Sequence, residues 1–239
     1  MLHLGKDNPN FEYTMGEGDS KIILNTTTCE KDLGVYIDPL LNFDQHITNT
    51  VNKARGTSFL LSKNITYKAA VVMVLLFKSL VRPILEYANA VWSPHLRKHV
   101  DAIEDIQRKF TKHIIGMKDL SYEQRLSILK LPSLEFRRIR GDLMDVYKIM
   151  HKIYDPITTK GLLPLAPEDN KTRGNKFKIL KQRTNTNNFK YFFTNRVVNL
   201  WNSLTDSIVD ACSINSFKDK IDFHFKDILY QTNINLYSL

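Results

Sequence analysis

Residues 76–150 decide the fold, and they read LFKSLVRPILEYANAVWSPHLRKHVDAIEDIQRKFTKHIIGMKDLSYEQRLSILKLPSLEFRRIRGDLMDVYKIM. Apolar residues recur in this stretch at steps of three and four, which is the period of one face of an α-helix. The clearest run consists of Leu96, Val100, Ile103, Ile106, Phe110 and Ile114. Gly116 follows it, and glycine is the residue that most often ends a helix. The pattern therefore predicts a long amphipathic helix that ends at Gly116.

A proline interrupts the apolar segment that precedes this helix. Residues 67–81 have the character of a buried helix, for which Thr66 is a candidate cap. Pro83 is predicted to kink or break it, because the residue before a proline is pushed out of the helical conformation. The longest apolar stretch, residues 69–77, falls well short of the ~20 residues that a membrane span requires.

Serine residues mark the expected starts of the helices that follow. Ser93 and Pro94 indicate a helix start, with the serine as cap and the proline in the first helical position. Ser121 and Gln124 have the spacing of a capping box. Ser133 is the expected cap of a further helix. Its core stripe is predicted to be Phe136, Ile139, Leu143, Val146, Ile149 and Met150.

Before residue 43 the pattern is typical of strands. Residues 11–15 and 21–24 flank a turn, and residues 33–37 form a further short strand. So few short strands make a weak sheet of their own, so we expect them to be the edge of a sheet that continues outside this chain. From residue 43 the period becomes helical, with Asn42 or Asp44 as the candidate cap.

After residue 155 the pattern breaks and then becomes helical again. Residues 156–188 contain prolines and a Gly/Asn/Lys-rich run, which indicates a linker or a long ordered loop. Residues 189–204 and 214–229 are two expected amphipathic helices. The predicted fold is mainly α: a thumb-like helical bundle, preceded by a short hairpin and edge-strand region and followed by a small helical domain. The expected divisions are 1–41, 42–155, 156–188 and 189–239.

The positive charge of the chain is concentrated in one region. The formal net charge is +9, and residues 171–205 contain eight basic side chains and no acidic one. These are Lys171, Arg173, Lys176, Lys178, Lys181, Arg183, Lys190 and Arg196. Such a field favours a polyanionic partner, with nucleic acid ahead of an acidic membrane surface. The alternative is a solvated basic loop without a specific partner.

Several other classes of site find no support in the sequence. The two cysteines, Cys29 and Cys212, have no metal-ligand spacing and indicate no disulfide framework. His95 and His99 are four residues apart, but spacing indicates no third ligand, so we expect no metal site. No secretory signal is visible at Met1, and no phosphate-binding or hydrolase motif occurs.

Four blocks of sequence resemble one family in one order. They are residues 4–9 with 13–15; residues 30–38 with 41–43, His46 and Ile47; residues 76–150; and residues 172–178 with Phe189, Phe192, Arg196, 199–202, Leu204, Phe217 and Lys218. Together they resemble the C-terminal part of the reverse transcriptases of non-LTR retrotransposons, the jockey/CR1-like LINE elements. The resemblance implies the end of the palm, the thumb and a post-thumb domain.

The resemblance also implies that this part of the family's reverse transcriptase lacks catalytic activity on its own. The catalytic palm turn, an aromatic-Ala-Asp-Asp sequence, does not occur in these 239 residues. The family's magnesium ions would belong to that missing palm, so we expect no cofactor here and no polymerase activity from this chain alone. The implied partners are the backbones of RNA, RNA–DNA hybrid or DNA, with no membrane and no small-molecule substrate. The implied localisation is intracellular, in cytoplasm and nucleus.

Polymerase thumbs grip the nucleic-acid backbone through basic helix faces, and arginine suits phosphates because its planar fork can bind two oxygens. Acidic residues on the same helices offer the opposite interpretation, a solvated face of mixed charge. The candidate binding residues are Arg108, Lys109, Lys112, Arg137, Arg138, Arg140, Lys171, Arg173, Lys176, Lys178, Lys181 and Arg183. Phe177, Phe189 and Tyr191 could stack on exposed bases or, as we favour, anchor the loop to the last helices.

Two functional hypotheses follow, beside a third possibility, a remnant that binds no partner, which only binding data would distinguish. The first is a truncated part of a LINE-type RNA-directed DNA polymerase, whose residual role is to grip the template-primer backbone. The alternative is a free-standing module, retained by a host, that binds nucleic acid or protein without enzymatic activity. The strands before residue 38 discriminate between them, because a free-standing module should cover these strands, whereas a fragment should expose them.

Overall fold

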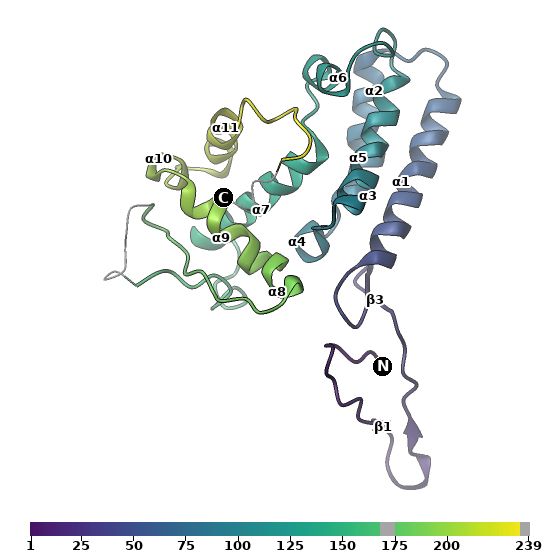
Figure 1. Ribbon diagram of the computed structural model, residues 1–239, viewed down its shortest axis with the longest axis vertical. Coiled ribbons are helices and arrows are strands. Elements are labelled where there is room, and N and C mark those ends of the chain that lie inside the picture. The colour runs from purple at the N-terminus through teal and green to yellow at the C-terminus, as the bar shows by residue number, and fades with distance from the viewer. Residues whose placement is uncertain (168–174, 235–239) are drawn as a thin grey trace.

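The computed structural model of the chain describes residues 1–167 and 175–234. The protein is mainly α-helical, as predicted, with two small antiparallel strand pairs before the helices. Figure 1 shows the helices in two groups, with α7 between them and the strand pairs projecting from one end. No helix in the described ranges has the length and apolar character needed to cross a membrane.

The N-terminal region forms two hairpins. In the first, β1 (Thr14–Met15) pairs with β2 (Ile22–Ile23), as the sequence predicts. In the second, β3 (Glu30–Asp32) pairs with β4 (Val35–Ile37). The prediction of one strand over 33–37 is wrong at its start, because Leu33 and Gly34 have φ of 44° and 87° and form the hairpin turn.

Helix α1 (Asp44–Asn64) begins where the helical period begins, but its cap differs from the prediction. Phe43 is the N-cap, in the left-handed conformation with φ of 59°. The Asp38 carboxylate accepts the backbone N–H groups of Asn42 and Phe43 at 3.1 and 2.6 Å. Asp38 therefore fixes the chain just before α1, and no side chain caps the helix itself, so the prediction of Asn42 or Asp44 as cap is wrong.

The apolar segment around Pro83 forms three short elements. These are α2 (Ala70–Leu76), the π-helical turn η2 (Phe77–Val81) and α3 (Arg82–Glu86). Pro83 lies in the first turn of α3, but the prediction that the residue before it leaves the helical conformation is wrong, since Arg82 has φ of −59° and ψ of −42°. The π-helical turn η2 precedes the proline, and the chain stays helical through it. The helix starts at Ala70 and not at residue 67, and Thr66 does not cap it, since Ala69 is the N-cap.

The predicted helix start at Ser93 is wrong. Ser93 ends the short helix α4 (Asn89–Trp92), and α5 (Arg97–Lys112) begins with Leu96 as its N-cap. The backbone between them is extended, with ψ of 120° at Ser93 and 130° at Leu96. The buried Trp92 anchors this junction, because its indole N–H donates to the Tyr87 carbonyl at 2.7 Å.

The caps predicted for the next two helices are confirmed. Ser121 and Gln124 form a reciprocal capping box at α6 (Tyr122–Leu129). The Ser133 hydroxyl accepts the Phe136 N–H at the start of α7 (Leu134–Met150).

The C-terminal helices are shorter than predicted. The expected helix over 189–204 is divided into α8 (Asn187–Tyr191) and α9 (Phe193–Ser203), because Phe192 is extended with ψ of 148°. After α10 (Asp206–Val209), α11 (Ile214–His224) ends five residues before its predicted end at 229. Residues Leu165 and Ile179 form an isolated antiparallel bridge within the preceding loop.

Buried apolar side chains form two clusters that meet in α7. The first extends from Val35 to Leu134 and includes the faces of α1 and α5. The second begins at Phe136 and is completed by α9, α10 and α11. Helix α7 therefore contributes its first residue to one cluster and most of its inner face to the other. Figure 1 shows it between the two groups of helices.

A buried carboxylate holds the start of α7. Glu104 of α5 is fully buried and accepts the Tyr122 hydroxyl at 2.5 Å. Its two oxygens also accept the backbone N–H groups of Leu134 and Glu135, at 3.2 and 3.1 Å. Burial raises the pKa of Glu104, although these hydrogen bonds and the nearby Arg138 act in the opposite direction. The carboxylate thus links α5, α6 and α7 at one point.

We predict that Glu104→Ala lowers the free energy of unfolding by about 3 to 5 kcal/mol, because three buried donors lose their acceptor. Glu104→Gln should cost less, since its amide oxygen still accepts. Urea denaturation of the two variants and the wild type measures the difference. Equal stability of the alanine variant and the wild type would show that the network is dispensable.

The same residue predicts a pH dependence. Because burial raises its pKa, folded Glu104 keeps its proton to a higher pH than the unfolded carboxyl does. Its stabilising contribution is complete below the unfolded pKa, about 4.3, and is lost as the pH rises through the folded pKa. The stability of the wild type relative to Glu104→Gln should therefore fall over this window, in urea titrations at each pH. A rise would contradict the assignment.

Candidate nucleic-acid interface

The candidate residues of α5 lie beside an acidic neighbour. Asp105 pairs with Arg108 at 3.7 Å and with Lys109 at 2.6 Å. The Arg108 guanidinium also lies over the Tyr122 ring, at 5.0 Å from its centroid. Lys112 is exposed and has no ion pair with any residue that the structure describes. Arg108 and Lys109 share this one carboxylate, and Lys112 is the one of the three cations without an ion pair to the described residues.

The arginines of α7 are held by other helices. Both nitrogens of the Arg137 fork contact the Glu86 carboxylate of α3, one of them at 2.8 Å. Arg140 binds Asp222 of α11 through two hydrogen bonds of 2.6 and 2.8 Å. Arg138 is 5% exposed. Contact of these groups with phosphate would compete with the ion pairs that attach α7 to its neighbours.

The candidates of the basic loop differ in their surroundings. Lys171 and Arg173 lie outside the described residues. Lys176 pairs with Asp210 at 2.7 Å, and Lys178 is half-buried. Lys181 and Arg183 are exposed, and neither forms an ion pair within the described part of the chain.

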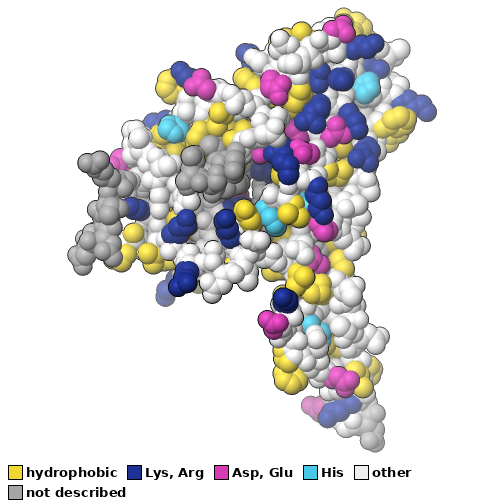
Figure 2. Space-filling view, viewed as in Figure 1, with side chains coloured by type: hydrophobic (Ala, Val, Ile, Leu, Met, Phe, Trp, Pro, Cys, Tyr) yellow, Lys and Arg dark blue, Asp and Glu magenta, His cyan; other side chains and the backbone are white. Residues whose placement is uncertain are grey.

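Lys190 extends the basic surface from the loop onto α8. It is exposed, and its ammonium lies 5.4 Å from the centroid of the neighbouring Tyr191 ring. On the face drawn in Figure 2, acidic side chains alternate with basic ones over α5, whereas those around α8 are basic without acidic neighbours. We name Lys181, Arg183 and Lys190 the basic strip.

Arg196 was counted in the positive excess of this region, but it is a core residue. Its side chain is 3% exposed, and it binds Asp142 of α7 through two hydrogen bonds of 2.8 Å. It also donates to the Ala90 carbonyl at 3.0 Å. Its helical position indicates burial in the sequence, because Leu200, four residues later on the same helix face, is a core residue.

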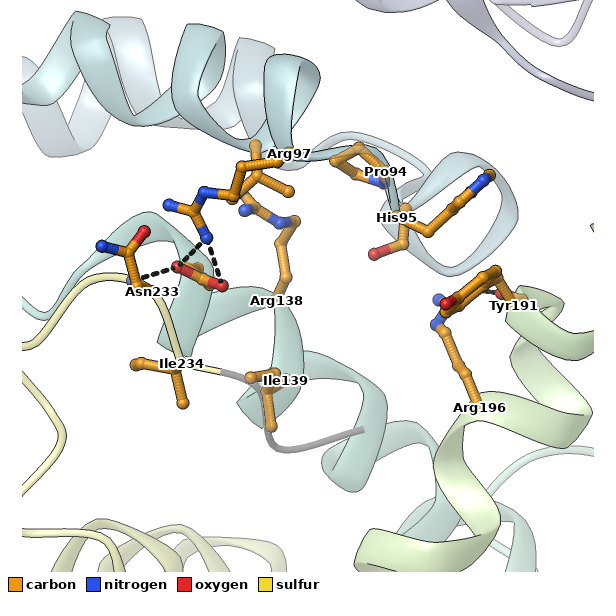
Figure 3. A pocket seen from close by; sticks show the side chains of 12 residues that line it. Pro94, His95, Arg97, Arg138, Ile139, Tyr191, Arg196, Asn233 and Ile234 are labelled. Atoms are coloured by element: carbon orange, nitrogen blue, oxygen red, sulfur yellow. Dashed lines mark hydrogen bonds and ion pairs between the residues drawn. The ribbon is translucent and has the colours of Figure 1, made fainter. Parts of the chain in front are cut away.

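Beside Arg196 lies a pocket of about 520 Å³ with several arginine side chains in its wall (Figure 3). Arg97 reaches it from α5, Arg138 from α7 and Arg196 from α9. Carboxylates accompany these groups: Arg97 pairs with Asp101 and Glu135, and Arg196 with Asp142. The arginine pocket is therefore close to charge-balanced.

A second cavity, of about 550 Å³, lies on the other side of His95 and Tyr191. The two rings stack at 4.4 Å with an angle of 6° between their planes, and both residues line both cavities. Four segments of the chain contribute to its walls: residues 5–6, the 39–43 turn, the junction between α4 and α5, and α8 with Phe192. We name it the aromatic groove, after Phe43, Trp92, His95, Phe189, Tyr191 and Phe192.

The sequence identified Phe189 and Tyr191 as stacking or anchoring residues, and the structure places both in the wall of this groove. Phe43, Trp92 and His95 on the opposite wall were not identified, because nothing in their local spacing relates them to α8. Burial lowers the pKa of His95, and the neighbouring His99 acts in the same direction. The imidazole is therefore neutral at neutral pH and has one donor and one acceptor nitrogen.

His99 of α5 makes a polar contact with α1. His99 binds the Asp44 carboxylate of α1, which also lies 3.7 Å from Lys98, and these contacts lower the Asp44 pKa. In the described ranges, no group of three or more His, Cys, Asp or Glu side chains is arranged to hold a metal ion.

We predict that Arg196→Ala lowers the free energy of unfolding by about 3 to 5 kcal/mol, because it leaves the charge of Asp142 buried without its partner. Arg183→Ala is the matched control, since this exposed arginine forms no ion pair with the described residues. It should change stability by no more than about 0.5 kcal/mol. Chemical denaturation compares the two, and equal effects would contradict the structural role of Arg196.

Comparisons with known proteins give little further information. No family profile matches the chain, and no solved structure matches it. An uncharacterized protein of Caenorhabditis elegans is 24% identical over 126 residues. The match covers 52% of this chain and 64% of that protein, which is less than two thirds of its length. Its name states no activity, so this similarity assigns no function.

Proposed function

We propose that this chain binds the nucleic-acid backbone without copying it, as the thumb and post-thumb part of a LINE-type reverse transcriptase. The observation that carries the proposal is the basic strip. Lys181, Arg183 and Lys190 are exposed without ion pairs to the described residues, in a segment whose sequence from 171 to 205 has no acidic residue. Unbalanced cations of this kind attract a polyanion.

The exposed lysine and arginine side chains favour contact with the phosphate backbone over sequence-specific contact with the bases. Lysine is a mobile point charge and arginine a planar fork, and both bind phosphate oxygens in any sequence context. Lys112 on α5 is a further unbalanced cation. Binding through such groups is sequence-tolerant and weakens with salt, because each contact releases counterions from the nucleic acid.

The exposed N-terminal hairpins support the relation to a polymerase palm. The apolar side chains of Met15, Ile22 and Ile23 are 64%, 64% and 59% exposed, and Leu33 at the second turn is 85% exposed. A free-standing module is expected to cover such side chains. Exposure is expected where a neighbouring sheet belongs to another part of a larger protein.

We expect no primer extension by this chain alone with Mg²⁺ and nucleotides. Two-metal catalysis needs a pair of carboxylates at the reacting phosphate, and the family's Asp-Asp pair does not occur in the sequence. The proposed role is accordingly to hold template and primer.

A protein-binding module is the second candidate, and an exposed apolar face favours it. Phe59 on α1 is 63% exposed, and Val71 and Leu75, four residues apart on α2, are 82% and 65% exposed. Such a module would bind RNA–DNA hybrid weakly or not at all, and its affinity for a protein partner would depend little on salt. The salt dependence of binding to the hybrid therefore separates the two candidates.

We predict salt-dependent binding of the chain to a labelled RNA–DNA hybrid. Contact with about five phosphates gives a slope of about −4 for log affinity against log salt concentration. Replacing Lys181, Arg183 and Lys190 together by alanine should reduce the magnitude of that slope by about 2 to 3. Fluorescence anisotropy at several salt concentrations measures both values.

The control variant replaces Lys53, Arg55 and Lys63 of α1 by alanine. It removes the same residue types from positions that are also exposed and without ion pairs to the described residues. Its slope should stay close to that of the wild type. A wild-type slope near zero, or equal losses in the two variants, would overturn the proposal.

A further inference from the structure

The aromatic groove has the size and lining of a binding site for a planar apolar group. Its volume of about 550 Å³ lies within the range of small-ligand sites, which runs from about 300 to 1,000 Å³. Phe189 and Phe192 are 41% and 45% exposed. Two aromatic side chains therefore present open faces at the wall of a preformed cavity. The buried Trp92 lines the groove from the opposite segment.

The groove is built rather than incidental, because polar contacts join its walls. The Asn188 amide donates to the Leu40 carbonyl, which links α8 to the 39–43 turn. The His95 ring stacks on Tyr191 and links the start of α5 to α8. These contacts fix three distant segments around one cavity without filling it.

The charge on the α8 side of the groove favours an anionic ligand, whereas Asp38 and Asp44 lie beside the 39–43 turn on the opposite side. No aspartate or glutamate is among the described residues that line it, whereas Lys6 does line it. Lys190 lies on α8 between Phe189 and Tyr191, and the exposed Lys181 and Arg183 lie in the loop that leads to α8. A ligand with one planar apolar part and negative charge close to it matches this arrangement.

Polar groups at the rim can orient such a ligand. Asn42, Ser93 and His95 line the groove and offer hydrogen-bond donors and acceptors. Because burial lowers the pKa of His95, its ring can both donate and accept at neutral pH. A nucleobase, with a π-face and polar edges, fits this combination better than an apolar peptide side chain does.

We propose that the aromatic groove takes an unpaired base of a single-stranded RNA or DNA segment, which stacks on Phe189 or Phe192 while the adjacent phosphates contact the basic strip. The assignment rests on the proposed function and adds a preference for single strands to it. Aromatic side chains beside a basic track are the general means by which proteins bind unpaired strands.

The arginine pocket carries no comparable assignment. Carboxylates already accompany Arg97 and Arg196 at its wall. His95 and Tyr191, which line it in Figure 3, also line the aromatic groove, so these two side chains separate the two cavities.

The test compares a single-stranded oligonucleotide that contains one 2-aminopurine with a blunt RNA–DNA hybrid of the same length. In the wild-type protein, binding of the single strand should quench 2-aminopurine fluorescence, since the base stacks on a ring. Changing Phe189 and Phe192 to alanine together should weaken single-strand binding roughly 10-fold and abolish the quenching. The affinity of the same variant for the hybrid should stay within about twofold of the wild-type affinity.

The matched control replaces Phe59 and Phe223 by alanine. Both are exposed, at 63% and 74%, and neither lines the groove. It should bind the single strand as the wild type does. Phe192→Trp, in the otherwise unchanged chain, keeps an aromatic face and should keep the quenching. Thermal unfolding confirms that each variant is folded, which is expected because the changed side chains are exposed.

The outcomes distinguish this inference from the proposed function. Unchanged single-strand affinity in the double Phe189/Phe192 variant, or equal losses for strand and hybrid, would overturn the base assignment. Salt-dependent hybrid binding through the basic strip would then still support the proposed function. If the wild type bound neither nucleic acid at low salt, both would fall. In a competition experiment, an apolar peptide should displace the bound single strand no better than a scrambled peptide of the same charge does. That result would strengthen the assignment of the groove to a base.

Discussion

The fold depends on one buried carboxylate. Glu104 accepts the first free N–H groups of α7 and the Tyr122 hydroxyl, so a single side chain determines how α5, α6 and α7 meet. The N-terminus of a helix carries unsatisfied donors and partial positive charge, and a carboxylate satisfies both. Burial of a carboxylate is costly and raises the Glu104 pKa, and these donors offset part of that cost. Because the start of α7 is fixed, Arg137 lies toward α3 and Arg140 toward α11. Each of the two arginines forms an ion pair there.

Local sequence rules predicted most of the fold and part of the candidate site. The capping box at Ser121 and the serine cap at Ser133 were predictable because their partners lie within one helical turn. The N-cap of α1 and the start of α5 were not, because α1 has no side-chain cap and Ser93 ends α4. The basic strip was predictable from charge alone, since no acidic residue lies nearby in sequence.

The rest of the site depends on contacts between segments far apart in the chain. Arg140 and its partner Asp222 are separated by 82 residues, and Arg196 and Asp142 by 54. The pattern within one helix cannot tell a solvated arginine from one that joins two helices. The aromatic groove is hidden in the same way, because the 39–43 turn and α8 meet only after folding. Sequence reasoning therefore identified the charges and missed the cavity beside them.

Helix α7 belongs to two hydrophobic clusters at once, and this limits how the molecule can be dissected. A cut after residue 155 would separate the face that begins at Phe136 from α9 and α11, its main covering helices. A cut before residue 134 would instead remove the Leu134 and Glu135 N–H donors and leave the Glu104 carboxyl group inside the first cluster without them. Neither half has a complete interior without this helix. The segments on its two sides are thus bound to unfold together, and selection on either surface acts on the stability of both.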